Sequence, residues 1–159
     1  MAPFRLWRIV FLLWCLEILL TLFFPSLWAW VDPLFLLLIF LGLHRASPRY
    51  LWLYGIFLGF LKDLATSGLF SGFTCTFALI GWLLESSRDW VEREDPLVQG
   101  IYAAVLTGFH NVVYGLLVIL ADPIVGWNRW WWGIVPLAML ISGGCALWGF
   151  PRLRRALLS

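Results

Sequence analysis

The few residues of this chain that could do chemistry lie inside long apolar blocks. Glu17 stands in the middle of the first block, Asp63 and Lys62 stand in the third, and His110 and Asn111 stand in the fifth. A charged side chain at that depth in a bilayer is costly. Such residues therefore face protein or water, and they mark ties between helices, proton relays or binding sites.

The sequence patterns of the common enzyme active sites are absent. There is no Ser/His/Asp set, no H-E-x-x-H motif, no phosphate-binding glycine loop and no Cys/His spacing suited to a metal. Cys15, Cys75 and Cys145 all lie within apolar blocks, where cysteine usually serves as a small packing residue. We therefore expect a protein that is not an enzyme and that holds no cofactor and no metal.

Gly55, Gly59 and Asp63 recur every four residues and fall on nearly one face of a helix. Two glycines at this spacing allow another helix backbone to approach closely, which is how helices associate in lipid. We interpret Asp63 in two ways: it ties the helix to the turn at residues 66–68 or to another helix, or it lines a functional pocket. Lys62 is next to Asp63 but does not face it, and we expect its ammonium group to snorkel toward the interface.

A second stripe of small residues follows the fifth block. Gly100, Ala104 and Gly108 recur every four residues, and Asn111 and Gly115 continue the same side. This pattern again predicts a close contact between helices. Glu17 must be protonated, paired or turned toward a cavity, and the sequence does not identify its partner.

The elements that position these residues are predicted to be membrane-spanning helices. The chain has 159 residues, is 62% hydrophobic and only 13% charged, and has a mean hydropathy of +0.89, whereas soluble domains are roughly 25% charged. The net charge of +2 gives no reason to expect nucleic acid as a partner. No small-x-small cleavage site follows the first block, so we expect it to be an uncleaved span. We predict an all-α integral membrane protein, one six-helix domain over residues 1–159, with spans at about 7–24, 27–43, 50–66, 69–85, 97–121 and 132–150.

The basic residues predict the orientation of these spans. Nine of the eleven lysine and arginine residues lie at the N-terminus, in alternate turns and at the C-terminus. Short loops rich in these residues stay in the cytoplasm. We therefore expect both termini and the turn at residues 86–96 to be cytoplasmic. The nine residues are Arg5, Arg8, Arg45, Arg49, Arg88, Arg93, Arg152, Arg154 and Arg155.

Several short motifs resemble a known family. They are the run from Asp32 to Leu38, the basic turn His44-Arg45, the run from Gly55 to Leu64, and Gly68 through Gly72. Together with the length and the basic tail, they are similar to the rod shape-determining MreD proteins of bacteria. The family usually has an apolar residue where this chain has Lys62.

The resemblance implies a non-enzymatic scaffold of the cell-elongation complex in the bacterial inner membrane. Its implied partners are a bitopic protein of the MreC type, the cytoskeletal protein MreB, the peptidoglycan synthase RodA with its transpeptidase, membrane lipids, and a second copy of the chain. The implied fold is similar to the S components of energy-coupling factor transporters. The alternative is therefore a substrate-binding membrane subunit of such a vitamin transporter. A vitamin binder should have several polar and aromatic side chains in a pocket on the outer side of the membrane. A scaffold should instead have apolar grooves that are filled by another helix.

Overall fold

A computed structural model describes residues 3–23, 32–44, 50–66, 71–87, 95–121 and 129–158. These segments form helices, so the prediction of an all-α protein is confirmed. The basic turns with Arg45, Arg49, Arg88 and Arg93 lie outside the described residues. The helices are α1 (Pro3–Phe23), α2 (Pro33–His44), α3 (Leu51–Ala65), α4 (Gly72–Ser86), α5 (Pro96–Ala121) and α6 (Arg129–Leu158).

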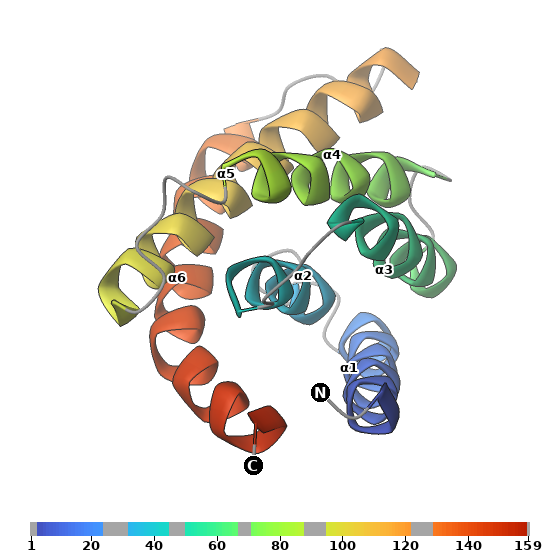
Figure 1. Ribbon diagram of the computed structural model, residues 1–159. Helices are drawn as coiled ribbons and strands as arrows, with labels where there is room; N and C mark the ends of the chain where they lie inside the picture. The colour runs from blue at the N-terminus through green and yellow to red at the C-terminus, as the bar shows by residue number, and fades with distance from the viewer. Residues whose placement is uncertain are drawn as a thin grey trace.

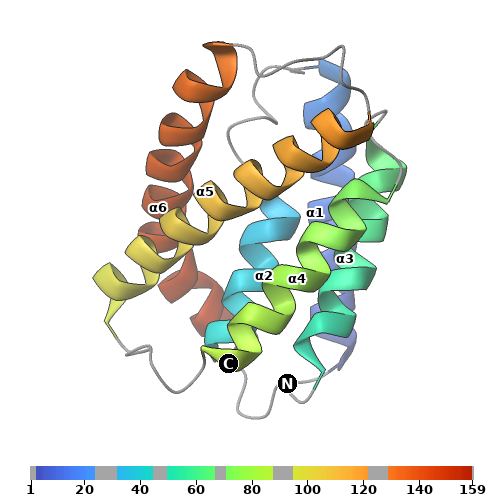
Figure 2. The same ribbon diagram turned by 90° about the horizontal axis from the view of Figure 1, so that it is seen from above.

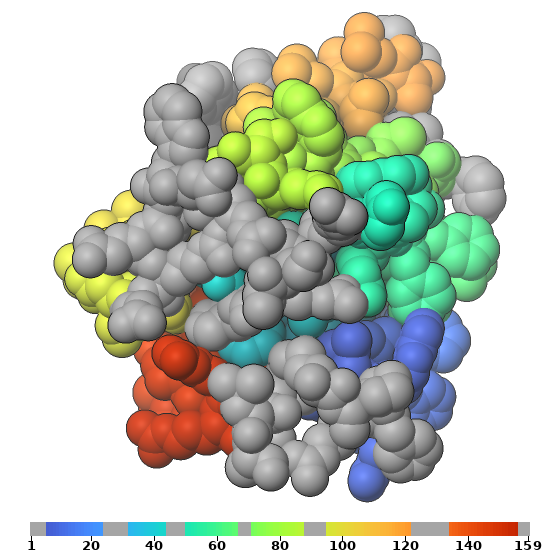
Figure 3. All heavy atoms as spheres, viewed as in Figure 1, coloured from blue at the N-terminus to red at the C-terminus, as the bar shows by residue number. Residues whose placement is uncertain are grey.

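The six helices form a bundle around α2. Figure 1 looks down the bundle and shows α1, α3, α4, α5 and α6 in an arc, with α2 in the middle. From the side, consecutive helices run in alternating directions, and both ends of the chain lie at the same end of the bundle (Figure 2). In the space-filling view, α1, α3, α4, α5 and α6 form the outline of the molecule (Figure 3).

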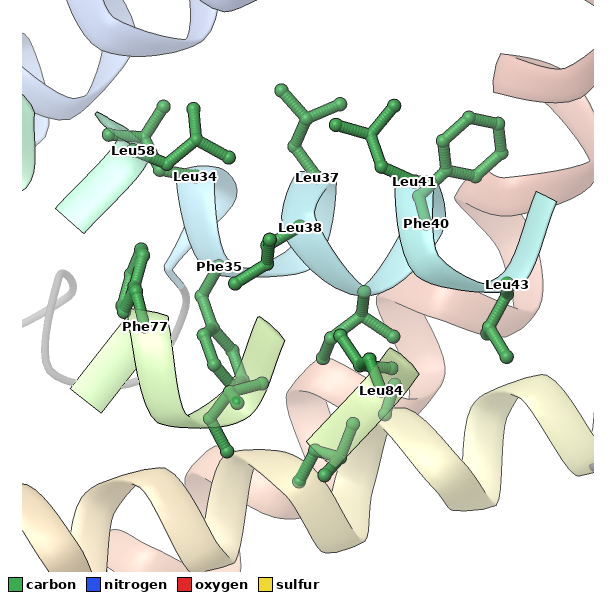
Figure 4. Packing of buried hydrophobic residues seen from close by; sticks show 14 of the residues in the cluster. Leu34, Phe35, Leu37, Leu38, Phe40, Leu41, Leu43, Leu58, Phe77 and Leu84 are labelled. Atoms are coloured by element: carbon green, nitrogen blue, oxygen red, sulfur yellow. The ribbon is translucent and has the colours of Figure 1, made fainter. Parts of the chain in front are cut away.

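Helix α2 forms the centre because its sequence is apolar on every side. A helix without a polar face has to be buried, and the leucines, phenylalanines and isoleucine of α2 are almost fully buried, with Leu36 only partly so. Figure 4 shows Phe35 directed toward Phe77 of α4, with Leu37 and Leu41 on the opposite side of α2. The rings of Phe35 and Phe77 are 5.2 Å apart. Proline favours the first helical turn, and α2 begins at Pro33.

The outer surface of the bundle is apolar, and several polar side chains are inside. Large apolar residues such as Leu22, Leu120 and Leu140 are exposed, whereas Glu17 and Lys62 are buried. Among the described helices, three are long and apolar enough to cross a membrane: α1, α5 and α6. Helices α2, α3 and α4 are shorter, with 12, 15 and 15 residues. A 15-residue helix is about 22 Å long, less than the ~30 Å hydrocarbon core of a bilayer.

Helix α6 extends beyond the predicted last span of about residues 132–150. It continues through Pro151 to Leu158. Proline removes one backbone hydrogen bond and clashes with the preceding turn. Transmembrane helices tolerate it because neighbouring groups and local adjustments satisfy the freed backbone. Consequently Arg152, Arg154 and Arg155 belong to the last turns of a helix and do not form a separate tail.

Candidate functional site: a buried ion cluster beside a capped helix pair

Helices α3 and α4 pack so closely that their backbones touch. A Cβ atom added to Gly59 would lie 2.5 Å from the Phe73 carbonyl oxygen and 2.6 Å from the Thr74 Cα. One added to Gly55 would lie 2.7 Å from the Phe77 carbonyl carbon, and one added to Gly81 would lie 2.8 Å from the Leu51 carbonyl oxygen. Real Cβ atoms do not approach other atoms that closely. Glycine is therefore required at these positions, and the stripe predicted from the sequence faces α4.

Asp63 fastens the end of α3 to the start of α4. Its Oδ1 accepts the Phe73 N–H at 3.1 Å, and its Oδ2 accepts the Thr74 N–H at 2.9 Å and the Thr74 hydroxyl at 2.6 Å. The first N–H groups of a helix have no partner within the helix, and the residue before it usually supplies a side-chain acceptor. Ser71 precedes α4 but makes no such side-chain bond. Asp63 caps α4 from another helix, and its negative charge sits at the positive end of the α4 dipole.

Lys62 points away from this cap and into a cluster with two carboxylates. Its ammonium group donates a hydrogen bond to Glu17 Oε1 of α1 and lies 3.1 Å from Asp32 Oδ2 at the start of α2. The Lys62 and Glu17 side chains are 1% and 0% exposed, and that of Asp32 is 15% exposed. The expectation that Lys62 snorkels to the interface is therefore wrong. Two acidic side chains inside the bundle compensate for the desolvation of its ammonium group.

Asp32 has a second role as the cap of α2. Its Oδ1 accepts the Phe35 N–H at 2.9 Å, and its backbone carbonyl accepts the Leu36 N–H at 3.0 Å. An aspartate followed by proline is a common start of a helix. The cluster of Glu17, Asp32 and Lys62, which we call the ion cluster, therefore joins three helices at one point. Among the described residues, no group of three His, Cys, Asp or Glu side chains could hold a metal ion.

Aromatic side chains line one side of the ion cluster. The Lys62 ammonium lies 5.2 Å from the centre of the Phe73 ring, which is within the range of a cation–π contact. His110 of α5 stacks on Phe35 at 4.6 Å and lies 5.9 Å from the Phe73 ring, and Tyr114 stacks on Phe73 at 4.3 Å. Within the described part of the chain, two buried polar atoms of this region have no hydrogen-bond partner: Glu17 Oε2 and His110 Nδ1.

The second small-residue stripe packs α5 against α6. A Cβ atom on Gly100 would lie 2.5 Å from Leu147 Cγ, and one on Gly108 would lie 2.6 Å from Met139 Sδ. Gly143 of α6 approaches both Gly100 and Ala104. Asn111 lies half-buried farther along α5. The stripe thus lies in a contact within the chain.

Sequence reasoning identified most of these residues but missed how they combine. Gly55, Gly59 and Asp63 were grouped on one face and do act together. The sequence alone does not identify the partner of Glu17, and it does not connect Asp32 with Lys62. Charge balance was the available signal, because a glutamate and a lysine inside different spans can compensate each other, and Lys62 is the only lysine.

Comparison with known proteins adds no assignment. No family model, no curated protein sequence and no solved structure matches this chain.

Proposed function

We propose that this protein is a non-enzymatic scaffold of the bacterial inner membrane, of the MreD type. In this role it binds an MreC-type bitopic protein and helps to couple MreB filaments to peptidoglycan synthesis by RodA and its transpeptidase. It acts through helix contacts within the bilayer and performs no reaction. The proposal starts from the resemblance of the sequence motifs and is supported by how the buried polar groups are used.

The observation that carries the proposal is that the buried charges hold the bundle together. Both oxygens of Asp63 are occupied by the first turn of α4, and Lys62 is occupied by Glu17 and Asp32. An active site needs polar groups that converge on a substrate. Here they converge on one another, which suits a rigid scaffold.

The outer face of the bundle suits a scaffold that meets other membrane helices. Along α5, Leu97, Ile101, Val105 and Phe109 recur every four residues and are exposed. In a bilayer this stripe faces lipid or the apolar side of a partner helix. We propose a six-span arrangement with both termini in the cytoplasm, supported by the positions of the arginines and by the chain ends, which lie at the same end of the bundle (Figure 2).

Purification of the tagged chain from native membranes tests this proposal. We expect mass spectrometry of the retained proteins to identify an MreC-type protein together with RodA and its transpeptidase. The control is an unrelated six-span protein with the same tag at the same expression level. Loss of rod shape on depletion, restored by the intact gene, is the expected cellular result. A chain that retains none of these partners and whose loss leaves cell shape unchanged would contradict the proposal.

A second candidate, the substrate-binding subunit of a vitamin transporter, is favoured by one observation. Glu17 Oε2 and His110 Nδ1 are buried without partners among the described residues, beside stacked aromatic rings. A ligand could satisfy such groups. The same purification separates the two candidates, because a transporter subunit would retain ATPase subunits and a small molecule. The oligomeric state, including a homodimer, is measured on the same sample by light scattering.

A further inference from the structure

The ion cluster contains more negative than positive charge. Glu17 and Asp32 contribute two carboxylates, and Lys62 contributes one ammonium. Lys62 and Asp32 are the charged groups that face Glu17 from α3 and α2, the helices packed against α1. Asp63, next to Lys62, is directed at α4, and His110 lies farther away in the aromatic stack. An unbalanced charge at such a buried place is strongly unfavourable.

The two carboxylates differ in how well they are supported as anions. Asp32 has a donor at each oxygen, the Phe35 N–H at Oδ1 and Lys62 at Oδ2, and it lies at the positive end of α2. Glu17 has Lys62 at Oε1 alone, and its Oε2 is fully buried without a donor among the described residues. A proton that balances the cluster therefore fits best on Glu17 Oε2.

We propose that Glu17 is a proton-binding site in the centre of the bundle. At neutral pH it holds one proton on Oε2 and accepts a hydrogen bond from Lys62 at Oε1, which leaves Lys62 and Asp32 as a neutral pair. This inference does not depend on the proposed scaffold function. Release of the proton places an uncompensated charge between α1 and its neighbours, so proton occupancy sets how firmly α1 is attached.

The structure also provides a route for the proton. Asp32 is the exposed member of the cluster, so a hydronium ion first gives its proton to the Asp32 carboxylate. Lys62 then passes the N–H proton that it donates to Glu17 onto Oε1 while it takes the proton of Asp32 from Oδ2, and rotation of the Glu17 carboxyl group brings the protonated oxygen to the position of Oε2. At the end Asp32 is again a carboxylate, Lys62 is again an ammonium, and Glu17 is a carboxylic acid. Charge and atoms balance without any other reactant.

The test observes Glu17 directly in the full chain in lipid nanodiscs. Glutamine at positions 85, 92 and 94 leaves Glu17 as the only glutamate, and ¹³C labelling of glutamate then gives one side-chain carboxyl signal. We expect the signal of a protonated carboxylic acid at neutral pH in sodium-free buffer. The carboxylic acid band in the infrared spectrum of the unsubstituted chain, lost in Glu17→Gln, gives the same information without the three substitutions.

Asp32→Asn is the decisive variant because it leaves one carboxylate for one ammonium. Glu17 should then become ionised at the same pH, whereas Glu85→Gln should leave its signal unchanged in the infrared experiment. An ionised Glu17 in the unsubstituted cluster would overturn the proposal. A Glu17 that stays protonated after Asp32→Asn would also overturn the proposal. Its protonation would then not result from two carboxylates that share one ammonium group. Ionisation that appears only with added Na⁺ would assign the site to a metal cation and would also overturn it.

Discussion

Replacement of Asp63 tests whether one side chain of α3 holds the start of α4. The carboxylate accepts three hydrogen bonds, from the Phe73 N–H, the Thr74 N–H and the Thr74 hydroxyl. Asp63→Asn keeps the shape but offers one acceptor oxygen, and its NH₂ group meets an N–H that needs an acceptor. Asp63→Leu offers none. Thr74→Val is the matched control, since it removes the hydroxyl donor and keeps both backbone bonds.

The structure sets the expected order of these effects. A hydrogen bond to a charged group contributes about 1.5–3 kcal/mol, so we expect Asp63→Asn to lower the free energy of unfolding by that amount. Asp63→Leu leaves two backbone N–H groups without acceptors, at about 1–3 kcal/mol each. Thr74→Val loses one hydroxyl bond to the same carboxylate, also worth about 1.5–3 kcal/mol, but leaves no backbone N–H without an acceptor. Asp63→Leu should therefore cause the largest loss of stability of the three variants.

Equilibrium unfolding in mixed detergent micelles, followed by circular dichroism, measures these differences. A double-mutant cycle between Asp63→Asn and Thr74→Val should show coupling, because the two residues contact each other. Asp63→Asn with the stability of the unsubstituted chain would refute the reasoning. The reasoning would also be refuted if Asp63→Leu lowered the free energy of unfolding no more than Thr74→Val does. The Phe73 and Thr74 N–H groups would then not need the carboxylate as an acceptor.

Three further predictions concern the ion cluster, the helix contact and the orientation. Lys62→Met should lower the free energy of unfolding by about 3–5 kcal/mol, and adding Glu17→Met should recover part of the loss; without recovery, the two residues are not paired. Gly59→Ala should cost about 1–3 kcal/mol because its Cβ meets the α4 backbone, whereas Gly144→Ala, with nothing within 4 Å, should leave stability unchanged. In a chain without native cysteines, Ser159→Cys should resist an impermeant thiol reagent added from outside; rapid labelling would contradict a cytoplasmic C-terminus.

The helices could be predicted from the sequence because a helix in lipid needs a long apolar segment and small residues where it contacts another helix. Apolar blocks and prolines at helix starts indicate the elements, and glycines four residues apart indicate where α3 and α4 touch. The end of α6 could not be predicted, because whether Pro151 stops a helix depends on its neighbours. The pairing of Glu17 with Lys62 depends on the packing of α1 against α3, and these residues are 45 positions apart.

Asp63 shows why the sequence can identify a residue and leave its partner open. From the sequence it could cap the turn that follows α3 at residues 66–68, and asparagine serves well in that role. In the structure its partners are Phe73 and Thr74, ten and eleven residues away, and each oxygen has its own donor. Asparagine, which offers only one acceptor oxygen, is therefore expected to cause a measurable loss of stability.

The short helix α2 explains why charges are retained in an otherwise apolar bundle. Lipid is as apolar as leucine, so apolar contact alone does not fix where a wholly apolar helix begins or how deep it sits. Asp32 fixes the start of α2 and pairs with Lys62, and Lys62 in turn holds α1 through Glu17. Asp63 orients α4 against the same end of α3. Removing these charges should therefore change the positions of the helices more than it changes whether the helices form. Distances between spin labels on α1 and α4 should change, whereas the helix content should change little.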